Sequence, residues 1–233
     1  MNKIIFLGLV ATFVTGCNST MEMPQDLASQ PSIPVTTEGG VLASGFYKGN
    51  FNIADLYTGR FHRSAEGTSV FDDTYKSKTG GLTLTINKKG ATEPWLLECK
   101  GSTSLTLGVF ESGKPYSCVI SQSNKQIGTF SLNPQENTSL VSFSMVEKDT
   151  GYISINDKRF DIESVNRIDG SMIDSEKPVG FIIKDNARTI AAINTNGAMA
   201  ITLQSNLPEF DKDVAAIGAL TAGFSWRPSN NED

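Results

Sequence analysis

The feature that most constrains this fold is an alternation of apolar and polar residues, repeated in short segments from about residue 41 onward. In "GGLTLTIN", for example, Leu82, Leu84 and Ile86 share one face and two threonines share the other. A period of two residues is typical of a β-strand with one buried face. The other segments of this kind are "SLTLGVF", "YSCVIS", "GTFSL", "SLVSFSMV", "YISIN", "RFDIESV", "VGFIIKD" and "TIAAINTNGAMAITL".

These segments predict about a dozen short strands, separated by Gly, Asn, Asp, Ser and Lys, the residues that turns favour. "TNG" at 195–197 is a strong signal for a tight turn. Strands and helices do not alternate, and no repeat of fixed period is present. The pattern favours an antiparallel barrel or sandwich, and the even composition predicts a single β-rich domain over 41–233.

One segment near the C-terminus, 208–224, breaks the β pattern. Its last eleven residues, 214–224, carry no charge, and large apolar residues recur at helical spacing between Phe210 and Phe224. A helix that is apolar all round is a buried helix, and small side chains make this one thin. We therefore predict a mainly β protein, an antiparallel β-barrel of about 12 strands around a buried helix at 208–224. The alternative is a β-sandwich with the terminal helix packed on one face.

The closing stretch "IIKDNARTIAAINTNGAMAITLQSNLPEFDKDVAAIGALTAGF" resembles the tubby C-terminal and phospholipid-scramblase-like superfamily. Its order is three strands, an acidic cap and an apolar helix. The resemblance implies a twelve-stranded barrel wrapped around a hydrophobic C-terminal helix. Eukaryotic members of that group contact lipids through basic surface residues. This chain has no matching basic cluster, so the resemblance assigns no binding residue and the ligand-binding residues stay unknown.

The chain begins "MNKIIFLGLVATFVTGC", which has the organisation of an export signal. Lys3 precedes an apolar run of eleven residues, which is too short to cross a bilayer as a helix. "VTGC" resembles the bacterial lipobox, in which the cysteine is acylated and becomes the first residue of the mature protein. We predict a lipoprotein signal peptide at 1–16 and lipidation, including palmitate, at Cys17. The alternative is an ordinary signal peptide with a chance cysteine.

The lipobox has consequences for location. Two or more acyl chains give stable membrane anchoring. In bacterial lipoproteins an Asp directly after the cysteine favours the inner membrane, and here that residue is Asn18, so we expect the outer membrane. Residues 17–40 are rich in Ser, Thr, Pro, Gln and Glu, which predicts a flexible tether that holds the domain off the bilayer.

The two remaining cysteines, Cys99 and Cys118, are expected to form a disulfide, because exported chains meet an oxidising compartment. A metal site is the alternative, but it needs more ligands than these two cysteines. The chain has one histidine and no C-x-x-C motif. We therefore expect no metal and no cofactor. With 20 basic and 25 acidic residues and no basic run, the chain is also not expected to bind nucleic acid.

Residues with catalytic chemistry are few. A Ser-His-Asp triad would require His62, the one imidazole, with partners such as Ser64 or Glu66, and no G-x-S-x-G motif is present. Between two arginines, His62 is interpreted as a surface residue at a strand edge. Three further features are interpreted as structural: a turn at Asp72 and Asp73, a solvated loop with Asn166, Asp169, Asp174 and Glu176, and core or capping roles for Trp95 and Trp226.

These observations predict no enzyme and no catalytic residue. The expected function is that of a membrane-anchored bacterial lipoprotein, a non-catalytic binding or structural module of the cell envelope. Its expected partners are the membrane, through the N-terminal lipid, and an envelope protein. Two alternatives stay open at this stage: a periplasmic carrier of a lipid or small apolar ligand, and a hydrolase of wall or surface polymers. The face of the outer membrane is not determined.

Overall fold

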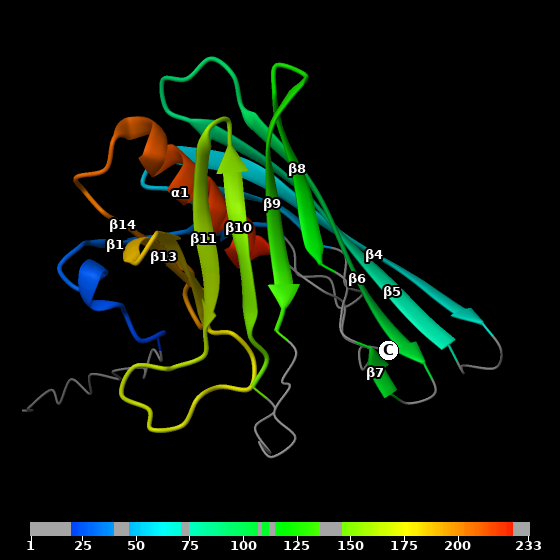
Figure 1. The fold of residues 1–233 in the computed structure, drawn as a ribbon. Coiled ribbons are helices and arrows are strands. Elements are labelled where there is room, and N and C mark those ends of the chain that lie inside the picture. The colour runs from blue at the N-terminus through cyan, green and yellow to red at the C-terminus, as the bar shows by residue number, and fades with distance from the viewer. Residues whose placement is uncertain are drawn as a thin grey trace, which may run out of the picture.

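In the computed structural model of the chain, one antiparallel sheet curls around an α-helix (Figure 1). The structure describes residues 20–39, 47–70, 75–106, 109–111, 115–135 and 146–225. The elements, in chain order, are a 3-10 helix (Gln25–Leu27), β1 (Ser32–Pro34), β2 (Thr36–Glu38), β3 (Tyr47–Ile53), β4 (Tyr57–Val70), β5 (Tyr75–Lys88), β6 (Trp95–Thr106), β7 (Val109–Glu111), β8 (Tyr116–Gln122), β9 (Lys125–Pro134), β10 (Asp149–Ile155), β11 (Lys158–Val165), β12 (Gly180–Asp185), β13 (Arg188–Asn194), β14 (Ala200–Leu203) and α1 (Glu209–Phe224).

The sheet is an up-and-down meander that nearly closes into a barrel. From β3 to β14 each strand pairs with the next one along the chain, except that β8 pairs with β6 and the short β7 pairs only with β6. At the two ends of this path, β1 pairs with β14 and β2 pairs with β3. Since Val35 alone separates β1 from β2, the segment 32–38 joins both edges of the sheet. Counted as one strand, this segment makes twelve strands around the barrel.

The interior is built from the alternation seen in the sequence. Leu82, Leu84 and Ile86 on β5 are all buried, while Thr83 between them is exposed. β8 follows the same pattern, with Tyr116, Cys118 and Ile120 buried. The segments "YISIN" and "RFDIESV" form a hairpin, in which Asn156 takes a positive φ of 51° where β10 turns into β11. The predicted Cys99–Cys118 disulfide is present, and its two residues are direct partners across β6 and β8.

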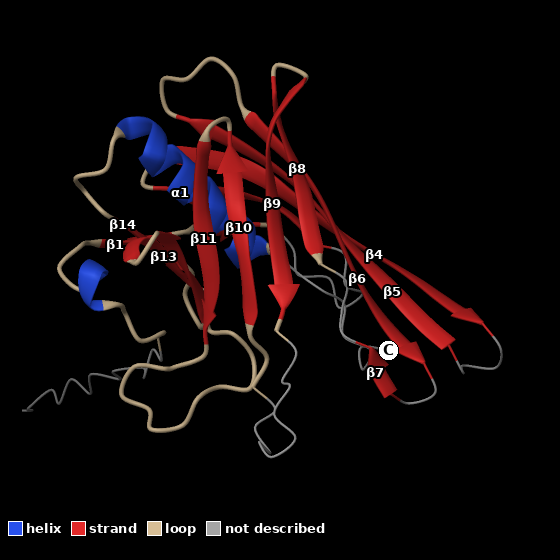
Figure 2. Ribbon diagram, viewed as in Figure 1, coloured by secondary structure: helices blue, strands red, loops and turns tan. Residues whose placement is uncertain are grey.

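Helix α1 lies inside the sheet, as predicted, and not on the outer face of a sandwich. It contacts β5 on one side and β9 to β14 on the others, and Figure 2 shows it behind β10 and β11. Every residue from Asp213 to Ala222 is buried. An added Cβ at Gly218 would lie 2.9 Å from Cγ2 of Ile153, and one at Gly223 would lie 2.6 Å from Cδ1 of Ile193. The small residues therefore let the helix fit tightly against the strands.

The structure differs from the expected tether over 17–40. In its described part, 20–39, Met21 and Leu27 are buried, and Val35 lies in the barrel core. The backbone N–H of Met21 donates to Oδ1 of Asn194 at 2.9 Å, and β1 and β2 both pair with neighbouring strands. A few apolar residues are enough to order this segment, because the sheet supplies the surface on which they pack and the partners for the backbone hydrogen bonds. The prediction of a flexible tether is wrong for these residues.

Several predictions fall on residues outside the described ranges. They are the signal peptide at 1–16, Cys17, Asn18, the carboxylates at 72 and 73, most of the strand expected in "SLVSFSMV", and Trp226. Within the described part of the chain, α1 is the one α-helix, and its length and apolarity do not suffice for a membrane span.

Candidate functional site

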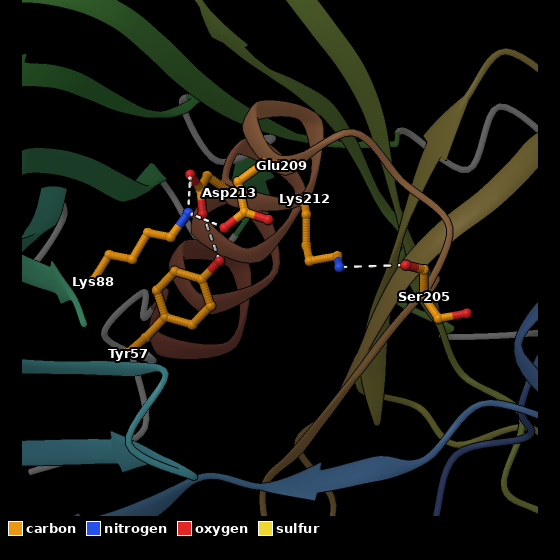
Figure 3. A network of polar contacts seen from close by, with 6 residues as sticks. All are labelled: Tyr57, Lys88, Ser205, Glu209, Lys212 and Asp213. Carbon is orange, nitrogen blue, oxygen red and sulfur yellow. Dashed lines mark hydrogen bonds and ion pairs between the residues drawn. The ribbon is translucent and has the colours of Figure 1, made fainter. Parts of the chain in front are cut away.

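The N-terminal end of α1 carries a network of charged and polar side chains (Figure 3). Tyr57 at the start of β4 and Lys88 at the end of β5 are direct partners across the two strands. The Tyr57 hydroxyl donates to Oδ1 of Asp213 at 2.6 Å. Nζ of Lys88 donates to Oδ2 of Asp213 at 2.8 Å and to Oε1 of Glu209 at 2.5 Å. The network joins the first turns of the helix to the wall of the barrel.

The protonation of this network follows from its surroundings. Burial, with the hydrogen bond to Asp213, raises the pKa of Tyr57 far above its ordinary value. Desolvation alone would lower the pKa of Lys88, but its hydrogen bonds to Asp213 and Glu209 outweigh desolvation and raise it. The hydrogen bond from Lys88 lowers the pKa of Glu209. At neutral pH the Lys88 ammonium therefore pairs with the Glu209 carboxylate, and the Tyr57 phenol keeps its proton.

Two further lysines hold the same end of the helix. Lys158 on β11 pairs with Asp211 at 3.1 Å, and this hydrogen bond raises the pKa of Lys158. Nζ of Lys212 donates to the carbonyl oxygen of Ser205 at 3.3 Å. Because Asp211 and Asp213 bind lysines from different strands, the first turns of α1 are fixed from two sides. The arrangement positions the helix. Its lysines and carboxylates are engaged with one another in that structural role.

The C-terminal end of the helix is held by Arg63. Its Nε donates to the carbonyl oxygen of Phe224 at 2.9 Å, and its guanidinium lies 5.9 Å from the centre of the Phe224 ring. The ring of Phe224 also stacks on Phe61, with 4.8 Å between centroids, and packs against Phe51. A cation near the last carbonyls of a helix complements its dipole. Arg63 thus has a structural role that sequence reasoning missed.

His62 points the other way, to the exposed outer face of β4. Its partners across the neighbouring strands are Lys48 on β3 and Thr83 on β5. The surface position that the sequence predicts is therefore confirmed, but the strand-edge position is wrong, because β4 has a partner on each side. The sequence pattern does not show which strands pair with β4, so it could not place His62 between two neighbouring strands.

The loop at 166–179 does not gather its acidic residues around one point. Within the described ranges, no three His, Cys, Asp or Glu side chains form a cluster that could hold a metal ion. Asn166 instead donates to the carbonyl oxygens of Glu147 and Ser175 at 3.0 and 3.1 Å. Asp174 accepts from Nε of Arg167 at 2.6 Å. These hydrogen bonds hold the loop in place.

Trp95, the described tryptophan, is 6 % exposed and belongs to the core, as predicted.

A polar hollow of about 460 Å³ lies on the outer face of β2 to β5. The strand register places polar side chains in two rows across this face. Glu38, Asn50 and Arg60 form one row, and the second row is Thr36, Asn52, Thr58 and Asn87. Most of these side chains are exposed. The hollow offers amides, hydroxyls, a carboxylate and a guanidinium, which suits a polar ligand held by several hydrogen bonds.

Sequence reasoning missed this hollow because no motif marks it. Its residues come from four strands and share a face only through the register of those strands. Polar residues in alternation are the ordinary outer face of a barrel strand. The nearest local feature is the turn after β3, in which the N–H of Asp55 donates to Oδ1 of Asn52 at 2.9 Å.

No family model, curated protein or solved structure matches this chain.

Proposed function

We propose that the protein is a lipid-anchored lipoprotein of the bacterial outer membrane and that its barrel is a non-catalytic binding module. Its partner is another protein of the envelope. The observation that carries the proposal is the position of α1: the helix occupies the interior of the barrel, where a carrier would hold its ligand. Binding then takes place on the outer surface.

The packing of the helix argues against the alternative of an apolar ligand carrier. Ala215, Ala216 and Ala219 are fully buried, and the glycines at 218 and 223 leave no space for an added Cβ. Ligand pockets in proteins typically have volumes of several hundred Å³. To create such a volume inside this barrel, the helix would have to leave it. That movement would break the ion pairs of Lys88 and Lys158 with the helix.

The anchor is supported by the sequence and by the disulfide. "VTGC" with an apolar run before it is typical of a lipoprotein signal, and acylation at Cys17 would hold the barrel at a membrane. The Cys99–Cys118 bridge fits an exported chain, because disulfides persist in oxidising compartments.

The polar hollow is the proposed contact for the protein partner. Its side chains have both charges, Glu38 in one row with Arg60, and hydrogen-bond donors and acceptors between and beside them. Such a surface matches the mixed polar surface of a protein interface better than it matches a lipid. Since Arg60 can bind a carboxylate through two hydrogen bonds, we expect it to contact an acidic side chain of the partner.

Site-specific photo-crosslinking in intact cells tests this proposal. A photoreactive residue replaces Thr58 in the hollow of the full-length, lipidated protein, and replaces Ser117, exposed on the outer face of β8, in the control. We expect one defined envelope protein to crosslink at position 58 and not at 117, and Arg60→Ala to reduce the yield about tenfold. Equal crosslinking at both positions, or no reduction by Arg60→Ala, would contradict the proposed contact.

A further inference from the structure

The loop between β11 and β12, residues 166–179, exposes two large apolar side chains to solvent. Met172 is 95 % exposed and Ile173 is 79 % exposed, and no other large apolar side chain in the described ranges exceeds 48 %. Two neighbouring residues of this kind at the tip of one loop differ from the single exposed apolar residues that most protein surfaces carry.

The tip of this loop is held in place by hydrogen bonds. Ser171 Oγ donates to the carbonyl oxygen of Ile173 at 2.8 Å and accepts from its N–H at 3.1 Å. The N–H of Ser171 donates to the carbonyl oxygen of Ile168, and Gly170 takes a positive φ of 73°. The ion pair of Arg167 with Asp174 closes the base of the tip. The exposed pair therefore projects from a defined turn.

The first described residues of the chain lie against the same loop. The carbonyl oxygen of Thr20 accepts from the N–H of Asp169 at 2.8 Å, and the N–H of Glu22 donates to the carbonyl oxygen of Arg167 at 2.9 Å. Met21 and Ile168 form a β-bridge between these two contacts. Figure 1 shows the start of the described chain beside this loop, at the end of the barrel away from the β10–β11 turn.

The predicted lipidation site, Cys17, is close in sequence to the residues that contact this loop. Cys17 precedes Thr20 by three residues, and three residues span at most about 10 Å. Since Thr20 is bound to Asp169, an acyl group on Cys17 brings the bilayer surface to the neighbourhood of the loop. Because so few residues separate the lipid from the barrel, this end of the molecule faces the membrane.

We propose that Met172 and Ile173 insert into the bilayer that holds the lipid of Cys17, as a second contact that orients the barrel. This inference rests on the proposed lipidation. Two apolar side chains bind a membrane weakly by themselves, but the anchor holds them at a high effective concentration beside it. The ion pair of Arg167 with Asp174 neutralises two of the charges next to the tip. In a meander, the turns alternate between the two ends of the barrel, so the β3–β4 turn beside the polar hollow points away from the bilayer.

Fluorescence quenching by brominated lipids tests the orientation. The full-length protein is expressed in bacteria, and its lipidated mature form is reconstituted in vesicles of phosphatidylethanolamine and phosphatidylglycerol. Ile173→Trp places a reporter at the loop tip and keeps it apolar. Leu56→Trp is the matched control, since Leu56 is 48 % exposed in the β3–β4 turn at the opposite end. The signal of the parent protein is subtracted from both.

We expect quenching at position 173 to exceed quenching at position 56 by about fivefold or more. Equal or absent quenching at 173, in a protein that floats with the vesicles and carries acyl chains by mass, would overturn the inference and leave the anchor intact. A mature protein that carries no acyl chain and does not float with the vesicles would overturn the proposed lipidation, and the inference with it. Circular dichroism of each variant checks that the barrel is folded.

Discussion

At the scale of single residues, Tyr57 connects the sheet to the helix through a short hydrogen bond to Asp213. Its side chain is nearly fully buried, so ionisation of the phenol would place a second negative charge beside the carboxylate. The folded state therefore keeps the proton, whereas an unfolded chain releases it near pH 10. A group whose pKa is raised by folding stabilises the protein below its unfolded pKa, and this contribution is lost as the pH rises above it.

Tyr57→Phe is expected to change how stability depends on pH. At pH 8 the variant should lose about 1 to 2 kcal/mol with the hydrogen bond to Asp213. Above pH 10 the wild type loses about 1.4 kcal/mol per pH unit from this group, which the variant lacks, so the two proteins should converge. Urea unfolding of residues 18–233 at pH 8, 9.5 and 11 measures the difference. A difference that stays constant across this range would contradict the assignment.

The disulfide is a second contribution at this scale. Cys99 and Cys118 are 19 residues apart in sequence and face each other across β6 and β8. Replacement of both by Ala should lower the free energy of unfolding by about 3 kcal/mol, because the unfolded chain regains the freedom of the closed loop. Urea unfolding under non-reducing conditions measures this loss. Dithiothreitol is the control: it should weaken the wild type to the level of the double variant and leave that variant unchanged.

At the scale of elements, α1 and the strands were predictable for one reason: the burial of each element is visible in its own local sequence. Leu82, Leu84 and Ile86 alternate because one face of β5 is interior, and 214–224 is apolar all round because strands surround it. The segment 20–39 has no such period, since its order comes from partners far along the chain such as Asn194. The polar hollow was not predictable either, because it depends on the register of four strands.

The fit of α1 is tested by a larger side chain at Gly218. Gly218→Leu should lower the free energy of unfolding by about 1 to 3 kcal/mol, since the new side chain meets Ile153 on β10. Ile153→Ala in the same chain should recover part of the loss, because it opens space at the same point. Urea unfolding of the two single variants and the double variant gives the coupling. Additive losses would mean that the helix does not pack against β10 at this position.

The N-terminal segment is tested by Leu27, whose side chain is fully buried. Leu27→Ala should lower the free energy of unfolding by about 2 to 5 kcal/mol, the usual loss for a buried leucine. Gln25→Ala, at an exposed position two residues earlier, is the matched control and should change it by less than about 0.5 kcal/mol. If both variants unfold at the same urea concentration as the wild type, the segment is a tether after all.

At the scale of the whole molecule, three features determine how the protein meets its surroundings. The helix fills the barrel, the polar hollow lies outside, and the first described residues are bound at the end that carries Met172 and Ile173. With the proposed lipid at Cys17, these features predict that the hollow lies away from the membrane. The twelve strands and the enclosed helix match what the resemblance to the tubby and scramblase-like group implies, but kinship with that group stays a prediction.

The most direct test of this account is the native mass of the mature protein, extracted from bacterial membranes in mild detergent. We predict the mass of residues 17–233 with one disulfide and the acyl groups on Cys17, and with no further molecule bound inside the barrel. A stoichiometric apolar ligand that is released only on unfolding, or a mature chain without acyl groups, would contradict the account.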